Sequence, residues 1–440
     1  MSNFELSSTG VLPPPLDTAA CGVPQVVLED LVLKHLLPRG TATLERLARE
    51  TRLPLKVMRE IVAALLSQQA ISLPVGLDHV VAPAVAASES VSLTSTGRAR
   101  ACEAFAVSRY LGPAPVSLQD YSEQCRKQQL DGSGISQEDL RTALTGVCLD
   151  EATLLDLQLA LSSGGSLLLS GQSGNGKTLL ASRLGQLIEQ SSEAVYVPYA
   201  IWVGEGFLRV FEPAIHRPLD QVALLDSLDW DPATDARWRR VRRPVIASTT
   251  TLTRDLFDIR SAGHGSSLMA PFQVLANGGM LIVDDLGRQP GSFADLMNRW
   301  LQPLEQQTDT LALPSGRQLN MPVDSWIVFV AGEDAPALPA PVARRIRCRV
   351  QLPAPDRDRF ATLLFEAGRR NRIEVDESGV EELFTQCYNP QNPPKCSDPQ
   401  NLLQAVESIC RIQKVTVRAR ADLLLTAAKR LGLNGERHAA

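Results

Sequence analysis

The stretch Gly171-Gln172-Ser173-Gly174-Asn175-Gly176-Lys177-Thr178 decides the fold of this 440-residue chain, because it matches the pattern G-x-x-x-x-G-K-[ST] at every fixed position. An apolar run at 166–170 precedes it, and a helical pattern at 178–190 follows it. In such a unit the glycines let the backbone wrap a polyphosphate, and the helix directs its positive dipole end at the same charge. We therefore expect a contiguous set of residues to bind a nucleotide: Gly171, Gln172, Ser173, Gly174, Asn175, Gly176, Lys177, Thr178 and Leu179.

Two side chains of this loop carry specific chemistry. Lys177 is expected to reach the β and γ phosphates, and the hydroxyl of Thr178 to bind Mg²⁺. A chance match in an unrelated loop is the alternative, and the flanking strand and helix argue against it. ATP and Mg²⁺ are therefore the predicted ligands.

A second motif, GMLIVDD at 279–285, describes a buried strand with two carboxylates at its C-terminal end. In P-loop folds this end of the strand faces the phosphates. Asp284 would hold Mg²⁺ through water, and Asp285 would orient or polarise the attacking water. Alone, the pattern could also be a strand that runs into a turn; downstream of a P-loop it favours the metal site.

The chain is long enough for two or three domains. Residues 1–26 are rich in Pro, Ser, Thr and Gly and are expected to be a flexible tail. Strands alternate with helices over 135–352, which predicts an α/β fold with a parallel sheet and helices on both faces. Residues 353–431 are mostly helical and predict a helical lid.

Residues 27–130 predict a winged-helix-like α+β module followed by linker helices. Three helical patterns, with Thr43 as a possible N-cap, precede short β-like stretches at 70–75 and 90–94, so the third helix would occupy the recognition position. The module has nearly balanced basic and acidic residues, whereas DNA-reading modules usually show a basic footprint. A role in protein binding or packing is therefore favoured, and DNA binding stays open.

Bulk composition sets further bounds. The net charge is −5, so a nucleic-acid contact would have to be a local patch. No apolar run is long enough to span a membrane, and the first residues lack a signal-peptide pattern, which indicates a cytoplasmic protein. The eight cysteines form no CxxC pair and have no histidine at zinc-ligand spacing, so reduced thiols are expected.

With these motifs in place, residues 140–430 resemble the bacterial AAA+ ATPases. The stretch 308–322 looks like a β-hairpin before the strand at 325–332, which is typical of the clade of MoxR-like, enhancer-binding and unfoldase ATPases. A closer resemblance is to bacterial AAA ATPases with an N-terminal winged-helix-like region, carried by YLGPAPVSLQDY (110–121), DARWRRVRRP (235–244), DDLGRQ (284–289) and LMNRWLQPLE (296–305). The resemblance implies ATP hydrolysis in a homo-oligomeric ring, hexameric by family expectation.

The resemblance also implies an arginine that completes the site of a neighbouring subunit. Arg344 and Arg345, in PAPVARRIRCRV at 339–350, match that position, and two surface arginines are the alternative. Three departures suggest slow turnover: Asp285 replaces the usual Glu, residues 330–334 offer no sensor-1 amide, and the sensor-2 position offers Gln400 in place of Arg.

Three further features allow two interpretations each. Trp202 and Phe207 flank a predicted turn and would either grip a partner or pack on the sheet. The five arginines within 237–243 would bind nucleic-acid phosphates or form a solvated or subunit-contact face. Arg288 would link the site to the ring interface or be a surface arginine. The sequence thus predicts an ATPase that remodels or positions a protein partner, with a nucleotide-gated DNA-binding motor or a low-turnover assembly switch as alternatives.

Overall fold

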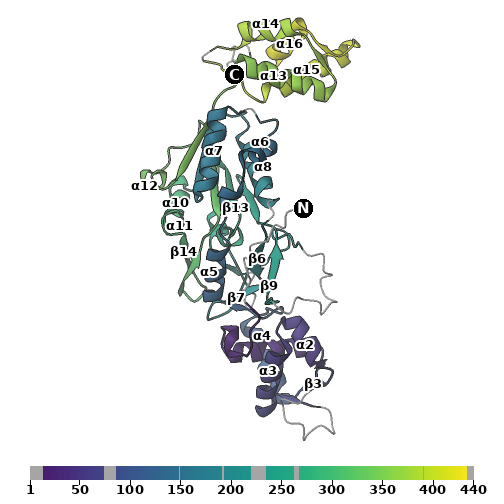
Figure 1. The fold of residues 1–440 in the computed structure, drawn as a ribbon, viewed down its shortest axis with the longest axis vertical. Helices are drawn as coiled ribbons and strands as arrows, with labels where there is room; N and C mark the ends of the chain where they lie inside the picture. Colours follow the sequence, from purple (N-terminus) through teal and green to yellow (C-terminus); the bar gives the residue numbers. More distant parts are fainter. Residues whose placement is uncertain are drawn as a thin grey trace, which may run out of the picture.

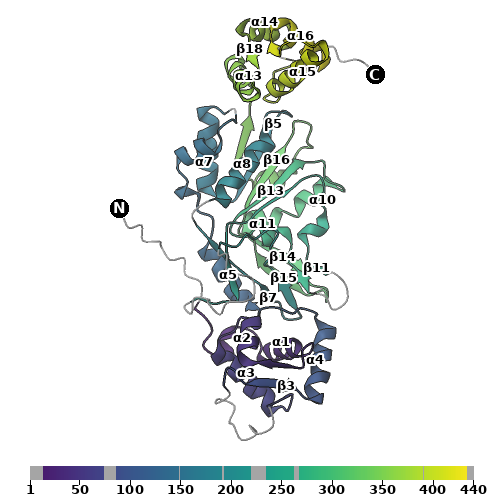
Figure 2. The same cartoon turned by 90° about the vertical axis from the view of Figure 1, so that its right-hand side faces the viewer.

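The structure is a computed structural model that describes residues 13–73, 86–147, 149–190, 193–219, 234–261, 267–389 and 391–433. The chain is elongated, with an N-terminal module at one end, a mixed α/β body in the middle and a helical unit at the other end (Figures 1 and 2). Each end has its own buried cluster of apolar side chains, and two clusters fill the body.

The central sheet has five strands, all paired in parallel, in the order β10-β13-β16-β5-β17. Their bounds are β5 Ser166–Gly171, β10 Val245–Ser248, β13 Met280–Leu286, β16 Trp326–Ala331 and β17 Cys348–Leu352. Apolar residues alternate between the two faces with the period of two that strands impose. Val328 and Val330 face one cluster, whereas Ile327 and Phe329 face the other.

Helices cover both faces of this sheet, as the sequence predicts. One face packs against α6 Gln137–Ala143, α7 Glu151–Ser163 and α8 Lys177–Glu189. The other packs against α9 Phe272–Leu275, α10 Phe293–Asn298 and α11 Leu301–Gln306. A parallel sheet of this kind is covered on both faces because the side chains of both faces are apolar and must be shielded from water. The α/β class and the parallel sheet are therefore confirmed.

The N-terminal module contains four helices and a three-stranded antiparallel sheet in the order β1-β3-β2. Its elements are α1 Gln25–Leu36, β1 Thr41–Thr43, α2 Leu44–Thr51, α3 Leu55–Ser67, β2 Ile71–Ser72, β3 Ser90–Leu93 and α4 Ser95–Val107. The hydroxyl of Thr43 accepts a hydrogen bond from the backbone of Arg46, so the predicted N-cap of α2 is confirmed. Strand β1 is an element that the sequence patterns did not indicate.

The expected flexible tail at 1–26 is wrong for its second half, while residues 1–12 lie outside the described residues. Cys21 and Val23 are buried in the core of the N-terminal module. The carbonyl of Cys21 also accepts a hydrogen bond from the buried guanidinium of Arg237 at 2.9 Å. A Pro-rich composition did not prevent order here, because burial of two apolar side chains and one long-range hydrogen bond hold the segment.

A second sheet, in the order β11-β12-β8-β7-β4, lies between the module and the central sheet. Its strands are β4 Val116–Ser117, β7 Ala200–Trp202, β8 Phe207–Arg209, β11 Arg260–Ser261 and β12 Leu268–Met269, and α5 Leu118–Lys127 follows β4. Two antiparallel pairs complete the body: β6 Val195–Pro198 with β9 Trp238–Val241, and β14 Thr308–Ala312 with β15 Gln318–Pro322. The last pair is the hairpin predicted at 308–322.

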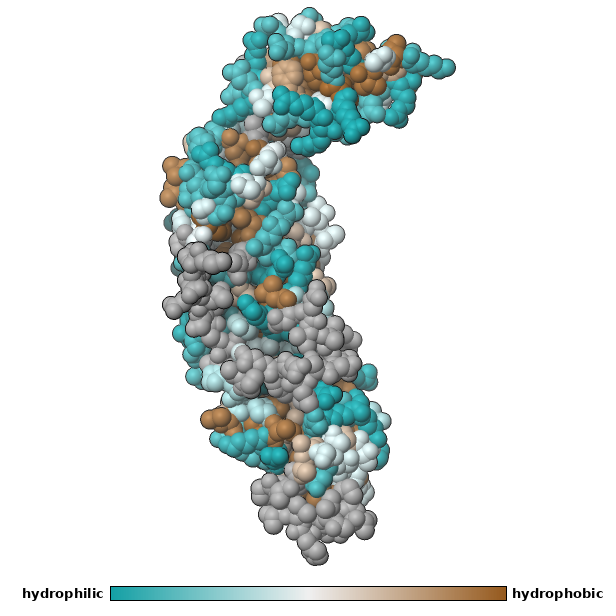
Figure 3. Space-filling model, turned by 45° about the vertical axis from the view of Figure 1, so that its right-hand side comes forward, coloured by the Kyte–Doolittle hydropathy of each residue, from teal (hydrophilic) through white to brown (hydrophobic). Residues whose placement is uncertain are grey.

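The C-terminal unit is helical, with one short parallel strand pair. Its elements are α13 Arg357–Asn371, β18 Glu374–Val375, α14 Glu377–Cys387, α15 Asp398–Gln413, β19 Arg418–Ala419 and α16 Ala421–Arg430. On the face drawn in Figure 3, hydrophilic surface prevails and hydrophobic residues occur in small groups. Among the described helices, none is both long and apolar enough to cross a membrane.

Candidate nucleotide-binding site

The loop between β5 and α8 has the backbone that the glycine pattern predicts. Gly171, Gly174 and Gly176 have φ values of 137°, 91° and 82°, a region that residues with a side chain rarely adopt. A side chain at Gly174 would also lie within 2.6 Å of the Ser397 hydroxyl. Helix α8 begins at Lys177, directly after Gly176, so the first backbone N–H groups of the helix point into the loop.

Lys177 lies within this loop, and its ammonium donates to the carbonyls of Gly171 and Gln172 at 2.8 Å each. Burial lowers the pKa of Lys177, and the carboxylates of Asp284, Glu333, Asp334 and Asp285 oppose that shift. The lysine is thus a partly desolvated cation held among anionic groups at the mouth of the loop. A phosphate oxygen is a stronger acceptor for it than a neutral carbonyl.

The two predicted acids lie directly before Leu286, the last residue of strand β13, whose pairing with β16 shifts register between Val283 and Leu286. Asp284 is buried and its carboxylate accepts the backbone N–H of Asp285 at 2.8 Å. Asp285 has a φ of 50°, which is uncommon for a residue with a side chain, and its own side chain is half exposed. The irregular backbone therefore turns two consecutive carboxylates toward the same space, where a regular strand would place them on opposite faces.

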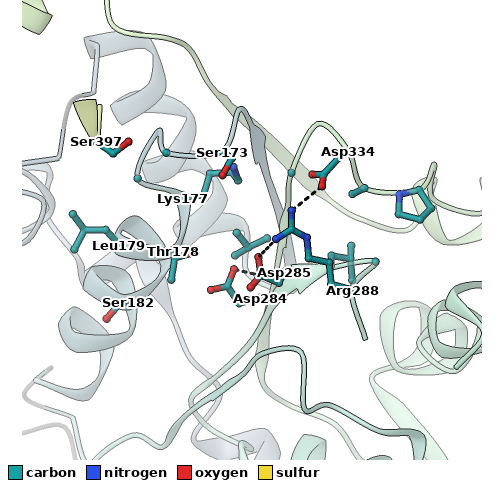
Figure 4. A pocket seen from close by; sticks show the side chains of 18 residues that line it. Ser173, Lys177, Thr178, Leu179, Ser182, Asp284, Asp285, Arg288, Asp334 and Ser397 are labelled. Carbon is teal, nitrogen blue, oxygen red and sulfur yellow. Dashed lines mark hydrogen bonds and ion pairs between the residues drawn. The ribbon is translucent and has the colours of Figure 1, made fainter. Parts of the chain in front are cut away.

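A pocket of about 610 Å³ joins these groups (Figure 4). The P-loop and α8 form one wall, the end of β13 and the turn after it form another, and the segment after β16 closes the far side. The lining residues are Ser173, Gly174, Gly176, Lys177, Thr178, Leu179, Ser182, Asp284, Asp285, Leu286, Gly287, Arg288, Val330, Gly332, Asp334, Ala335, Pro336 and Ser397. The pocket thus combines a hydroxyl, carboxylates and a lysine with the start of a helix.

Arg288 and Asp334 form a part of the wall for which the sequence had no firm role. The guanidinium of Arg288 donates to Asp334 at 2.7 Å and lies 4.0 Å from a carboxylate oxygen of Asp285. This hydrogen bond lowers the pKa of Asp334 and raises that of Arg288. Gly287 approaches Pro336 so closely that a side chain there would lie 2.3 Å from the ring. The turn after β13 and the segment after β16 are therefore joined.

The C-terminal unit reaches the P-loop through the start of α15. The backbone N–H of Ser397 donates to the carbonyl of Gly174 at 3.0 Å, and that of Cys396 to the side chain of Asn175 at 3.4 Å. Gln400, the expected sensor-2 residue, is instead hydrogen-bonded to Asn371 and is not among the lining residues. About one helical turn explains the difference, because Ser397, the residue just before α15, contacts the loop, and Gln400 lies three residues further along the helix.

Most of the predicted phosphate and metal residues meet in the pocket, and several do not. Gly171, Gln172 and Asn175 shape the loop through backbone contacts and hydrogen bonds without lining the cavity. Arg344 and Arg345 directly follow α12 Ala340–Ala343 and are not among the residues that line the pocket. Arg345 pairs with Glu305 at 2.8 Å, and the side chain of Arg344 donates to the carbonyl of Ala340.

The paired aromatic residues of the β7–β8 hairpin pack inside the molecule. Phe207 stacks on Tyr110 with ring centroids 4.8 Å apart, and Trp202 meets the edge of Phe207 at 5.5 Å. Phe207 belongs to the apolar cluster of the N-terminal module, and the partly buried Trp202 packs against that cluster. This packing favours the structural interpretation of the pair over a partner-gripping one. Arg317, on the β14–β15 hairpin, donates to the carbonyl of Val203 at 2.7 Å, so the two hairpins are tied together.

The arginine run around β9 divides into buried and exposed members. Arg237 binds Asp235 through both carboxylate oxygens and also donates to the carbonyls of Cys21 and Pro115. Arg243 donates to two carbonyls and to Glu193. Both arginines are 3% exposed, so neither is free to contact a nucleic acid.

Comparison with known proteins names no family for this chain. No family model matches it, and no curated protein matches it. Among solved structures, the RuvB Holliday junction branch migration motor of Thermotoga maritima shares 12% identity at a TM-score of 0.34, over 72% of each chain. NtrX from Brucella abortus shares 15% identity at a TM-score of 0.39, over 72% of this chain and 63% of its own. TM-scores below 0.5 do not establish a common architecture, so the assignment rests on this chain's own loop, sheet and pocket.

Proposed function

We propose that this chain is an ATPase of the AAA+ type that binds ATP with Mg²⁺ and hydrolyses it. The observation that carries the proposal is the single pocket in which Lys177 and Thr178 of the P-loop face Asp284 and Asp285 of β13. Each pair alone is a common local pattern. Together, at the carboxyl ends of β5 and β13 of one parallel sheet, they would provide the phosphate, metal and water positions that phosphoryl transfer to water requires.

The residues present suit Mg²⁺, which prefers oxygen ligands and is usually bound through one or two carboxylates together with phosphates and water. Thr178 would offer its hydroxyl, and the buried carboxylate of Asp284 would act through water. The ion would neutralise charge on the phosphates.

The chain's own side chains would divide the remaining work. Lys177 and the N–H groups at the start of α8 would hold the β and γ phosphates in line. Asp285 would accept a hydrogen bond from the attacking water and take its proton as the new P–O bond forms. The bond from the γ phosphorus to the bridging oxygen would break, leaving ADP and inorganic phosphate.

We further propose that the active form is a homo-oligomeric ring in which a copy's Arg344 or Arg345 completes the site of its neighbour. Both side chains lie outside their own pocket, which suits supply to another copy. The N-terminal winged-helix-like module would then engage a protein partner. On helix α3, Lys56 is exposed, Arg59 is half-buried and the remaining side chains are acidic, polar or apolar, so the helix presents two cations for DNA.

Steady-state ATP hydrolysis measured against protein concentration tests the proposal. Turnover per subunit should rise with concentration, and Lys177→Ala, Arg344→Ala and Arg345→Ala should be compared with Arg411→Ala, an exposed arginine far from the pocket. An active site shared between subunits is supported if Lys177→Ala and either Arg344→Ala or Arg345→Ala lose ATP hydrolysis while Arg411→Ala retains it. If turnover per subunit does not change with protein concentration and equals that of Lys177→Ala while ATP still binds, the chain is a low-turnover assembly switch instead. Salt-sensitive DNA binding would identify a DNA motor.

A further inference from the structure

Arg288 stands out because it faces the pocket and is only partly engaged. Its side chain is 55% exposed, whereas the guanidinium of Arg237 is buried and each of its nitrogens donates to an acceptor. One hydrogen bond to Asp334 holds the guanidinium, which has five N–H donors in a rigid fork. Figure 4 shows this group between Asp285 and Asp334, across the pocket from Thr178.

The distribution of charged side chains in the pocket indicates which part of a nucleotide Arg288 would face. Among the described lining residues, Lys177 and Arg288 are the cations, and Asp284, Asp285 and Asp334 are the anions. Lys177 belongs to the wall made by the P-loop. The added negative charge of a triphosphate over a diphosphate is on its terminal group, which extends away from that loop toward the strand ends. Arg288 is the cation on that side.

Among the described lining residues, no second cation lies on this side of the pocket. The end of β16 and the segment after it contribute Val330, Gly332, Asp334, Ala335 and Pro336, none of which has a side-chain amide or a cationic side chain. Asp334 accepts from Arg288 and so fixes one edge of the guanidinium, leaving its other donors available to a phosphate oxygen.

We propose that Arg288 contacts the terminal phosphate of ATP within its own chain and that Asp334 positions it, so that the site distinguishes ATP from ADP. The inference rests on the proposed ATPase function and deepens it. Because Arg288 also faces Asp285, its movement to the phosphate would free that carboxylate for the attacking water. Binding of the triphosphate would thus change the contacts of Arg288 with two segments, the turn after β13 and the segment after β16.

Binding of two nucleotides to the full chain tests this assignment. Affinities for Mg²⁺-ADP and for the Mg²⁺ complex of the non-hydrolysable β,γ-imido analogue of ATP are measured by titration calorimetry. Arg288→Ala should weaken the triphosphate by about tenfold or more, as expected for a lost charged hydrogen bond, and ADP by less than about twofold. Arg288→Lys should lose part of this discrimination, because an ammonium cannot bind Asp334 and a phosphate in the same fork geometry.

Asp334→Asn tests the positioning role, since it keeps the size of the side chain and removes its charge. It should lower the ratio of triphosphate to diphosphate affinity in the same direction as Arg288→Ala, by a smaller factor, while Arg411→Ala leaves the ratio unchanged. Equal weakening of both nucleotides by Arg288→Ala, or no weakening of either, would overturn the inference and leave Arg288 as a tie between two segments. If the parent protein and Lys177→Ala bind both nucleotides alike, the ATPase proposal itself fails.

Discussion

Two regions of this molecule use arginine and aspartate in opposite ways. At the junction between the N-terminal module and the body, Arg237 is 3% exposed and its guanidinium reaches both oxygens of Asp235 and two backbone carbonyls. In the candidate nucleotide pocket, Arg288 is more than half exposed and pairs with Asp334 through one hydrogen bond. The same two residue types are therefore buried with every guanidinium nitrogen hydrogen-bonded at the junction, and exposed with unused hydrogen-bond donors in the pocket.

The difference follows from desolvation. A buried ion pair survives only if nearly every donor has an acceptor, and removing one partner leaves an uncompensated charge. Such a pair holds segments together and has nothing left for a ligand. An exposed pair contributes little to stability, and its spare donors remain available. Substitutions at the junction should therefore change folding, and substitutions in the pocket should change nucleotide chemistry.

The largest effect is expected for Asp285→Asn in the pocket. The amide cannot accept a proton from water, so ATP hydrolysis should fall by about 10³-fold. Nucleotide binding and the melting temperature should stay near parental values, because the side chain is half exposed and Asn tolerates a positive φ. Hydrolysis, ATP binding and thermal unfolding measured on one preparation check this. A variant that unfolds early or retains its activity would contradict the assigned role.

Arg237→Ala should have the opposite profile. Loss of the guanidinium leaves Asp235 buried without its partner and two carbonyls without a donor, so the free energy of unfolding should drop by about 3 kcal/mol. Denaturant unfolding measures the drop, and ATP affinity at low temperature should be retained. Arg240→Ala, an exposed arginine on the same strand β9, is the matched control and should change stability by less than about 0.5 kcal/mol. Equal effects of the two substitutions would remove the distinction.

Asp324 extends the comparison to a half-buried residue near Arg243, one of whose carboxylate oxygens is enclosed. Burial raises its pKa to about 7, and Arg243 and Gln129 only partly oppose this. The folded state therefore favours the protonated form, and the stability from this group is lost as pH rises from about 4 through 7. Asp324→Asn should remove that loss, making the variant more stable than the parent at pH 8 by about 2 kcal/mol. Free energies of unfolding measured at pH 5 and pH 8 for both proteins test this. An equal pH dependence in the two proteins would exclude Asp324 as the source of the loss of stability.

Arg411→Ala should have the smallest effect. Arg411 pairs with Glu407 one turn earlier on α15, and its side chain is 77% exposed. Its removal should change the free energy of unfolding by less than about 0.5 kcal/mol and leave nucleotide binding and hydrolysis unaltered. The same assays as above measure it. A larger change would mean that exposure alone does not separate the two classes of arginine.

The geometry of the candidate nucleotide site was predictable where it depends on contiguous residues. The spacing of Gly171, Gly174 and Gly176 reports a backbone that only glycine adopts easily, and Lys177 follows at the start of a helix. The strand that carries Asp284 and Asp285 was visible as an apolar run that ends in acids. The hairpin at 308–322 was likewise readable from a turn between two β-like stretches. Each of these features depends on the backbone conformation of consecutive residues, which the local sequence pattern indicates.

The other features depend on contacts between distant residues. Arg288 and Asp334 are 46 positions apart, Arg237 and Cys21 are 216 apart, and nothing in either local sequence indicates the partner. The five arginines at 237–243 look alike as letters, and only the packing of β9 separates buried from exposed members. Gln400 and Ser397 were likewise distinguishable only once α15 was placed against the P-loop.

What the amino-acid sequence determined by itself is therefore the local framework: a glycine-rich loop before a helix, two acids at a strand end, and a parallel sheet that carries them. Tertiary structure alone decided which charged groups face the pocket and which are sealed at the junction. The physical reason is that backbone conformation is set largely by neighbours in the chain, whereas desolvation and hydrogen-bond saturation are set by whatever the fold brings alongside.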